Sequence, residues 1–499
     1  MRTLERVRAT SWAVVVAPTL GAFLFSADTI TIQIANPRIG ASLHTGLDGL
    51  QWAANGFLLP FCVLLVAAGT LADKLGARRV LLAGIAVFGL GELLGSFAQS
   101  IDMLVAGRVL AGVGAAAMIP AGVSALRLQL PERRLAGAMA IWMAGAMTGV
   151  ACGSVVAGLL LRVTSWRGVL WPLAGAAAVG FVIAAVTLKD VRVERVQKLE
   201  AGWNLGFAVG LGGLVWGLIR AGSHGWSSPQ ALAPIVIGVT ALAVTTVLII
   251  PKLRRSAGDL DLPRIGVAIV VVITANFGIV SMVFFLSLWY QQVAGRSALG
   301  TAVVLLPFIG LSAAAALGVG PLITRVGAPR MLVGGFVLHV AGLAGLSQLE
   351  RTTGYGEQVS FLIMVGVGLA ATLTALAMVL LKSAPADRGG LMSGLQTSAN
   401  QTGAVLSIAL IGSIIASTIG SSYSDGLAAA GLPRAVSGSV VAELAQGITP
   451  TAEPQRRIGQ EVFSAAVGQG MLIATGAAAI GLLLSLWLVR RMRSPQPAD

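Results

Sequence analysis

The sequence predicts an all-α, polytopic membrane protein, and the prediction rests on its composition, its long apolar segments and the placement of its basic residues. Of 499 residues, 56% are hydrophobic and only 11% are charged, whereas a soluble domain carries about 25% charged residues. Apolar segments long enough to cross a bilayer as helices recur along the whole chain. Cys62 and Cys152 lie inside such segments and the three histidines are far apart, so we expect no disulfide framework, metal site or other cofactor.

Fourteen membrane-spanning helices are predicted from these segments. They cover residues 12–35, 50–72, 79–98, 103–126, 135–161, 168–188, 203–221, 230–250, 264–290, 299–323, 329–349, 358–382, 393–418 and 468–489. Basic residues precede the first segment, as in a signal peptide, but the segment is too long and has no small-residue cleavage site. We therefore expect a retained first helix, and the even number of spans places both termini on one side of the membrane.

The basic residues identify that side. The loops on the side of the termini hold 24 Lys and Arg residues, the loops on the other side hold nine, and Arg108 lies inside a span. Cytoplasmic loops carry the excess of positive charge, so we expect a multi-pass protein of the cell membrane with both termini in the cytoplasm. Most of the net charge of +14 is then a signal of topology, with anionic lipid headgroups as neighbours, and nucleic acid is not an expected partner.

The chain also repeats itself. Residues 69–79 resemble residues 320–330, at an offset of 251, and residues 131–134 resemble residues 385–388, at an offset of 254. Chance similarity of two glycine-rich loops would explain one match, but two nearly equal offsets indicate two homologous six-helix halves in parallel.

This repeat predicts the division of the chain. An N-terminal six-helix bundle is expected at residues 1–188, a linker with an inserted helix pair at 189–263, and a C-terminal bundle at 264–499. The one long loop is expected at about 419–467, on the outer side, with an amphipathic helix near 436–447. We assign no chemistry to that loop.

The short charged segment between the second and third spans carries the first family resemblance. It reads G-T-L-A-D-K-L-G-A-R-R from Gly69, with Asp73, Gly76, Arg78 and Arg79. It resembles the loop between helices two and three of the major facilitator superfamily, G-x-L-A-D-x-x-G-x-R/K-x, although an ordinary positive loop is the alternative. Because the acid stands among basic residues at a membrane edge, we expect an ion-pair latch that stabilises one gating state.

The number of spans and the inserted helix pair narrow the resemblance to the fourteen-helix drug:proton antiporter branch of this superfamily. The resemblance implies the major facilitator fold, with two pseudo-symmetric six-helix bundles plus two inserted helices. It also implies a monomeric secondary transporter that exports hydrophobic or amphiphilic small molecules, such as antibiotics, in exchange for protons. The proton gradient would supply the energy, and alternating access about a central cavity would supply the mechanism.

Asp28 is the principal candidate for proton coupling. A carboxylate within a span costs about 2.5–3.5 kcal/mol, so it should face a cavity or a partner. The stretch that begins at Asp28 is similar to the first-helix motif of the branch, D-x-T-I-V-N-x-A-L-P, and matches at Asp28 and Pro37 but not at Gln33 and Asn36. The alternative is a carboxylate satisfied by a neighbouring hydroxyl such as that of Thr29.

Two further charged residues lie inside predicted spans. Arg108, with Gly112 and Gly114, looks like the fourth-helix motif R-x-x-x-G-x-G, and a guanidinium beside the cavity would favour loss of a proton from a nearby acid. The alternative is a helix-end arginine that extends to the outer interface. Glu92 lies in the third span; the family requires no acid there, so a second proton site, a substrate contact and a hydrated interfacial residue all stay open.

The fifth span resembles the antiporter signature G-x-x-x-G-P-x-x-G-G at Gly149, Gly153 and Gly158. Glycines at this spacing allow helices to pack backbone to backbone. Ser154 stands in place of the proline and Ala157 in place of the first glycine of the pair. These departures weaken the expectation of antiport and keep proton-coupled uptake open.

The C-terminal half has no Asp or Glu inside its spans, so its cavity candidates are neutral. They are Asn276, Tyr290, Gln291, Gln396, Asn400 and Gln401. Such residues resemble those that line the pathway in the family, or they hydrogen-bond between helices.

Three alternatives to drug export remain on the sequence alone. Uptake or symport of a metabolite is the alternative within transport. A membrane-embedded enzyme acting on lipids would need a nucleophile–base pair or a metal cluster, and the sequence contains no His-rich set and no H-E-x-x-H motif; we do not expect an enzyme. A non-transporting sensor would tolerate neutralisation of Asp28 and Arg108.

Overall fold

The computed structural model describes residues 12–191, 201–257, 261–350, 353–382, 389–432 and 452–493, with isolated positions between 440 and 450. In this part of the chain the regular structure is helical and no strand occurs. Fourteen segments are long and apolar enough to cross a membrane, which confirms the predicted class and number of spans. The chain divides into two compact units, one of residues 1–45, 49–208 and 297–302, the other of residues 46–48, 209–296 and 303–499.

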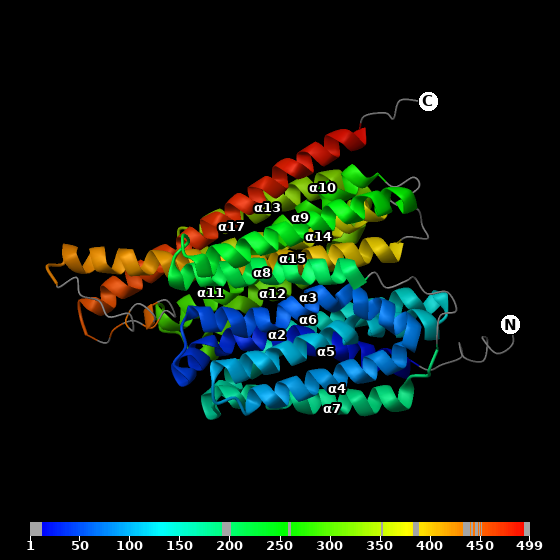
Figure 1. Ribbon diagram of the computed structural model, residues 1–499, viewed down its shortest axis with the longest axis horizontal. Helices are drawn as coiled ribbons and strands as arrows, with labels where there is room; N and C mark the ends of the chain where they lie inside the picture. The colour runs from blue at the N-terminus through cyan, green and yellow to red at the C-terminus, as the bar shows by residue number, and fades with distance from the viewer. Residues whose placement is uncertain are drawn as a thin grey trace. The chain divides into compact units, whose positions relative to one another are not determined.

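Six membrane-length segments make up the bulk of the first unit. They are α2 (Ala13–Leu43), α3 (Leu47–Leu75), α4 (Ala77–Ser96), α5 (Ile101–Gln129), α6 (Glu132–Val163) and α7 (Trp171–Thr187), the last preceded by a 3-10 turn at Trp166–Val169. Within this unit α4 packs most extensively against α5, and α2 against α6 (Figure 1). Small residues allow this approach: a Cβ on Gly91 of α4 would lie 2.7 Å from the carbonyl oxygen of Gly107 on α5.

The first helix is longer than predicted. The sequence predicts a span that ends near residue 35, but α2 continues through Pro37 to Leu43 and ends where His44 adopts a left-handed conformation. Proline removes one backbone donor, yet the residues around Pro37 are buried and helical, so the proline does not end the helix. Asp28 therefore lies at the midpoint of α2, whereas in the shorter predicted span it lies closer to the outer end.

The remaining helices fall largely in the second unit. They are α8 (Ala201–His224), α9 (Pro229–Ala257), α10 (Leu262–Phe277), α11 (Ile279–Gln292), α12 (Ala298–Val326), α13 (Ala328–Leu346), α14 (Tyr355–Lys382), α15 (Gly389–Ala429) and α17 (Gln455–Arg493). A cluster of buried apolar side chains from α10, α13, α14, α15 and α17 forms a core of this unit. The predicted span at 264–290 is a helix pair, because Gly278 interrupts it between α10 and α11.

The long loop predicted at 419–467 is shorter in the structure. Helix α15 extends to Ala429 and α17 begins at Gln455, and the two helices pack against each other, as the orange and red ribbons of Figure 1 show. Tyr423 and Leu427 are buried there, so apolar packing extends both helices beyond the predicted ends. The amphipathic helix near 436–447 and the repeat at 385–388 lie almost entirely outside the described residues.

The internal repeat appears in the structure as the same glycine turn at two positions. Gly76 separates α3 from α4 with φ of 99°, and Gly327 separates α12 from α13 with φ of 90°. The Gly76 amide donates to the Ala72 carbonyl at 3.0 Å, and the Gly327 amide donates to the Ile323 carbonyl at 2.8 Å. A positive φ favours glycine, which explains why glycine stands at both positions. The same one-residue break between helices therefore occurs twice, at the offset that the sequence repeat predicts.

Candidate functional site

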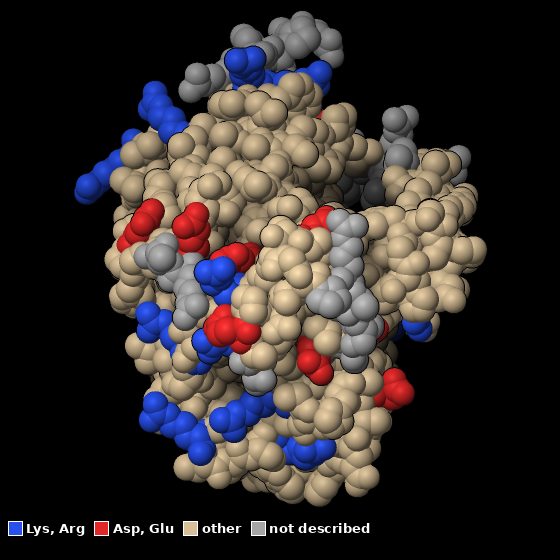
Figure 2. All heavy atoms as spheres, turned by 90° about the vertical axis from the view of Figure 1, so that its left-hand side faces the viewer, with Lys and Arg blue, Asp and Glu red and all other residues tan. Residues whose placement is uncertain are grey.

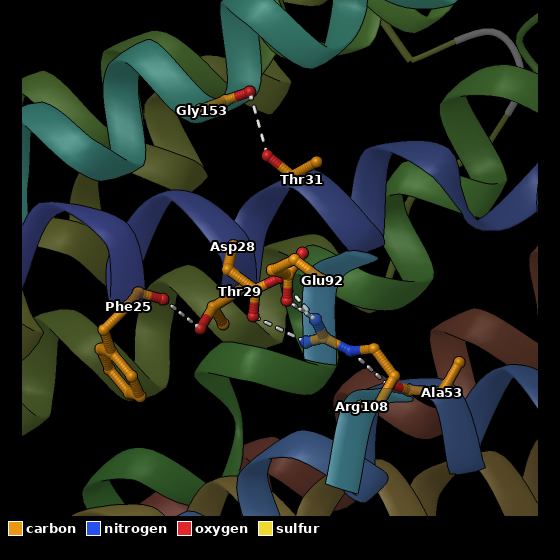
Figure 3. Close-up of polar contacts among 8 residues, drawn as sticks. All are labelled: Phe25, Asp28, Thr29, Thr31, Ala53, Glu92, Arg108 and Gly153. Atoms are coloured by element: carbon orange, nitrogen blue, oxygen red, sulfur yellow. Dashed lines mark hydrogen bonds and ion pairs between the residues drawn. The ribbon is translucent and has the colours of Figure 1, made fainter. Parts of the chain in front are cut away.

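Asp28, Glu92 and Arg108 lie together inside the first unit, as Figure 3 shows. They come from α2, α4 and α5, and their exposed fractions are 0%, 1% and 2%. The three charged residues predicted within spans are therefore one buried cluster, although the sequence places them on three separate helices.

The Arg108 guanidinium is the centre of this cluster. Its Nη2 donates to Asp28 Oδ2 at 2.7 Å and its Nη1 donates to Asp28 Oδ1, so the two side chains pair through both arms. Its Nε donates to the Ala53 carbonyl at 3.2 Å, and the guanidinium lies 4.5 Å from the centre of the Phe57 ring. Arg108 is thus held on several sides, and the alternative that it extends to the membrane interface is wrong.

The two carboxyl groups are not equivalent. Asp28 forms the bidentate pair, whereas Glu92 has one contact with Arg108, from Nη1 to Oε1 at 3.2 Å. Glu92 Oε2 receives no hydrogen bond from any described donor, and the Glu92 carboxyl lies within hydrogen-bonding reach of Asp28. Two ionised carboxylates so close would repel each other. The geometry therefore distinguishes the two acids: Asp28 holds both arms of the guanidinium, and Glu92 is the more weakly bound carboxyl group.

The formal charges of the three groups do not cancel. One guanidinium and two carboxylates would leave a net charge of −1 in a site without solvent exposure, and an uncompensated buried charge is costly. One proton makes the cluster neutral. Beside it lies a cavity of only about 10 Å³, lined by Thr29, Ile32, Gln33, Ala54, Phe57, Leu58 and Arg108. That volume is at the lower limit for one water molecule, so water gives the charges little screening.

Glycines of α6 bring that helix close to Asp28. A Cβ on Gly153 would lie 2.7 Å from the Ala27 carbonyl oxygen, and one on Gly149 would meet the Phe23 carbonyl. The Thr31 hydroxyl donates to the Gly153 carbonyl at 3.4 Å (Figure 3). The glycine spacing in the fifth predicted span thus fixes the helix that carries Asp28. Gly158 is buried farther along α6.

The proline expected in this motif is replaced without a break in the helix. The Ser154 hydroxyl donates to the Ala151 carbonyl at 2.9 Å within α6. Helix α6 runs from Glu132 to Val163 with no proline inside it.

The charged segment after α3 has partners other than those expected. Residues from Gly69 to Leu75 are helical, and Gly76 is the single non-helical residue before the next helix begins. The predicted pairing of Asp73 with the adjacent basic residues is wrong.

The structure gives these groups other neighbours. Arg79 pairs with Asp190 at 2.8 Å, Arg78 donates to the Ala185 carbonyl at 2.8 Å, and the Asp73 carboxylate lies near Ser124 and Arg127. These residues contact α5 and the C-terminal end of α7 instead of one another. Such contacts join segments that are far apart in the sequence, so the local spacing of charges does not predict them.

Several neutral candidates of the second unit hydrogen-bond between helices. Asn276 of α10 donates to Asn400 Oδ1 of α15 at 2.7 Å. Gln396 of α15 donates to the Leu373 carbonyl of α14 at 3.3 Å. Asn276, Asn400 and Gln396 therefore hydrogen-bond between helices, which was the alternative to lining the pathway.

The other neutral candidates differ among themselves. The Tyr290 hydroxyl of α11 donates to Gln358 Oε1 of α14 at 2.9 Å. Gln291 donates to the Ser287 hydroxyl of its own helix at 3.2 Å, and Gln401 is half-buried on α15. Tyr290 also lines a cavity where α11 ends and α14 begins.

Two buried asparagines were not predicted as site residues from the sequence. Asn36 of α2 and Asn55 of α3 are both 0% exposed, and neither side-chain amide has a hydrogen-bond partner among the described residues. In the sequence, Asn36 stands out only as a departure from the first-helix motif. The sequence does show that each asparagine lies inside an apolar span. A buried amide needs hydrogen-bond partners, so this position is the feature that could have marked them as site candidates.

The comparisons with known proteins fit this architecture. Residues 19–408 match the model of the Major Facilitator Superfamily. The chain is 32% identical over 440 residues to the tetracenomycin C resistance and export protein of Streptomyces glaucescens, covering 86% of this chain and 80% of that protein. It is 29% identical over 494 residues to the multidrug resistance protein Stp of Mycobacterium tuberculosis, covering 94% and 90%.

A solved structure agrees at the level of the fold. The structure of an auto-inhibited POT family peptide transporter superimposes with a TM-score of 0.67 at 14% identity, covering 98% of each chain. At this identity the match shows the fold alone. With fourteen membrane-length helices, a duplicated glycine turn and a family match over most of its length, this multi-pass membrane protein belongs to the Major Facilitator Superfamily.

Proposed function

We propose that this protein exports hydrophobic or amphiphilic small molecules, antibiotics among them, in exchange for protons. Relatives named for tetracenomycin C export and for multidrug resistance support export. The buried cluster of Asp28, Glu92 and Arg108 supports proton coupling and is the observation that carries the proposal. No enzymatic activity and no cofactor enter it, since the proton gradient supplies the energy.

The cluster explains how protons and substrate would compete. With one proton the three groups are neutral, and without it they carry a charge of −1 among buried surroundings. Either a proton or a cationic group of the substrate can neutralise that charge, but both together would leave an excess positive charge. Because the two ligands exclude each other at one site, transport of one outward drives the other inward through alternating access.

Each residue has a separate role in this scheme. Asp28 holds Arg108 through two hydrogen bonds. Glu92 takes up and loses the proton, because its carboxyl has the weaker contact with Arg108 and one oxygen without a described donor. Arg108 moves toward Glu92 when the proton leaves, since a second carboxylate then competes for its Nη1. Because the three residues lie on α2, α4 and α5, this movement of Arg108 would change the contacts between these helices. Protonation is thereby linked to helix packing.

The orientation and assembly follow from the charge distribution. We propose that both termini lie in the cytoplasm, because the loops on their side hold 24 of the 34 basic residues. In that orientation α2 begins at the cytoplasmic side and Asp28 lies at the midplane. A cell membrane location and a monomeric transporter complete the proposal.

Inside-out vesicles test the proposal. A proton gradient is established with a respiratory substrate, and a panel of lipophilic cations and neutral drugs is added to vesicles with the wild type, Asp28→Asn or Glu92→Gln. Drug-dependent collapse of the gradient that is lost in Glu92→Gln supports antiport at this cluster. No collapse with any compound, from protein shown to be folded, favours uptake. Collapse that survives both substitutions would place the proton site elsewhere.

A further inference from the structure

A second cavity lies within the second unit. Its volume is about 370 Å³, which falls in the usual range of small-molecule sites, about 300–1,000 Å³. It lies where α11 ends and α14 begins. The lining residues are Trp289, Tyr290, Ala294, Arg296, Thr353, Tyr355 and Gln358.

The residues beneath this cavity are buried, and their polar groups are already paired. Tyr290 is 0% exposed and its hydroxyl donates to Gln358 Oε1 at 2.9 Å. The Gln358 amide nitrogen donates to the Thr353 carbonyl at 2.8 Å, and the Trp289 indole nitrogen donates to the Ser464 hydroxyl at 2.9 Å. Tyr290 and Trp289, which is 1% exposed, are therefore buried beneath the cavity, and the Tyr355 ring, with 44% of the residue exposed, is the aromatic surface open to a ligand.

Arg296 is the exception among the lining residues. Its side chain makes no ion pair with a described carboxylate, and its guanidinium lies 5.6 Å from the centre of the Tyr355 ring. The turn holds the backbone of Arg296, whose side chain is exposed: Gly295 has φ of 65°, and the Arg296 amide donates to the Tyr290 carbonyl at 2.8 Å. A positioned cation with free N–H groups beside an aromatic ring is suited to a carboxylate or phenolate.

The surrounding surface does not favour anions by itself. Figure 2 views the helix ends on the left of Figure 1, and acidic as well as basic side chains are exposed on that face. Glu350 and Glu357, at either side of the α13–α14 connection, are both exposed. A negative ligand would therefore be held by Arg296 itself rather than by a broad positive field.

We propose that this cavity binds an aromatic small molecule that carries one ionised acidic group. The acid pairs with Arg296, and the ring packs against Tyr355. The site goes beyond the proposed function, because it lies in the other unit and uses none of the residues of the buried ion-pair cluster. Its ligand is an anion, whereas the cluster attracts protons and cations.

Binding of three matched probes tests this site. Full-length protein in lipid nanodiscs is equilibrated by dialysis with 2-naphthoate, 2-naphthalenemethanol or 2-naphthylmethylammonium, and empty nanodiscs provide the blank. We expect saturable binding of 2-naphthoate, weaker binding of the alcohol, and weakest binding of the ammonium probe. Equal binding of the three probes, or no saturable binding of 2-naphthoate, would overturn the proposal.

Two variants and a matched control locate the binding. Arg296→Gln should weaken 2-naphthoate binding by about tenfold, the loss expected for one charge-assisted contact, without a change for the alcohol. Tyr355→Leu should weaken both. Arg220→Gln is the control, because Arg220 also lies near an aromatic ring, that of Trp216 at 5.8 Å, but does not line the cavity. An unchanged affinity in Arg296→Gln contradicts the assignment. No proton gradient is present, so the result is independent of the vesicle experiment.

Discussion

Substitutions at Asp28 and Glu92 should affect stability non-additively, because both carboxyl groups serve one guanidinium. Glu92→Gln leaves the bidentate Asp28 pair intact and removes a single contact at 3.2 Å, so we expect a loss of about 1 kcal/mol or less. Asp28→Asn breaks the stronger pair. Glu92 can then release its proton and pair with Arg108, which limits the loss to about 1–2 kcal/mol.

The double variant removes both possible partners. Arg108 would then be a buried, unpaired cation, a defect that costs about 3–5 kcal/mol. The two single losses sum to at most about 3 kcal/mol, and the central values of these ranges predict a coupling of about 2 kcal/mol between Asp28 and Glu92.

Reversible unfolding of the purified protein in mixed micelles, with increasing sodium dodecyl sulfate, measures all four free energies of unfolding. Arg108→Gln in the background of the double variant provides the control, since removal of the unpaired cation should restore stability. Additive losses, or a double variant as stable as Asp28→Asn, would refute the idea that Glu92 acts as the reserve partner of Arg108.

Three further outcomes are expected. Gly153→Leu should separate α6 from α2, because even a Cβ there would lie within 3 Å of backbone atoms; we expect a loss of about 1–3 kcal/mol and of drug-dependent proton movement, whereas Gly175→Leu, with nothing within 4 Å of its Cβ, should behave as wild type in both assays. Gly76→Ala should cost about 1 kcal/mol in unfolding experiments, because φ is 99° there. Arg79→Gln should change stability by less than about 1 kcal/mol, because its pair with Asp190 is largely exposed, with side-chain exposures of 58% and 30%; a larger loss would contradict the view that this contact is a surface ion pair.

The membrane helices and the charged site residues could be predicted from the sequence for one physical reason. The bilayer sets the length of an apolar helix and penalises charge within it. The fourteen spans therefore stand out, as do Asp28, Glu92 and Arg108 inside them. The duplicated turn was also predictable, because Gly76 and Gly327 occupy matching positions in a repeated pattern.

Features that depend on contacts between distant segments could not be predicted. The spacing of charges suggests local partners for Asp73, but Arg79 pairs with Asp190, more than a hundred positions later in the chain. The three charged side chains of the cluster come from separate helices, and only packing shows that Asp28 takes both arms of the guanidinium. In the sequence Arg296 is one loop charge among others, since nothing in its neighbourhood indicates that α14 folds beside it.

Release of protons on substrate binding tests the central claim most directly. The compound that collapses the vesicle gradient most strongly is added to purified protein in unbuffered detergent solution with a pH indicator. If the cluster exchanges its proton for substrate, the wild type releases protons in proportion to the bound compound. Glu92→Gln, whose amide is always neutral like a protonated carboxyl, binds a cationic compound more weakly and releases no proton. Equal release by Glu92→Gln, or binding by the wild type without any release, would contradict the account.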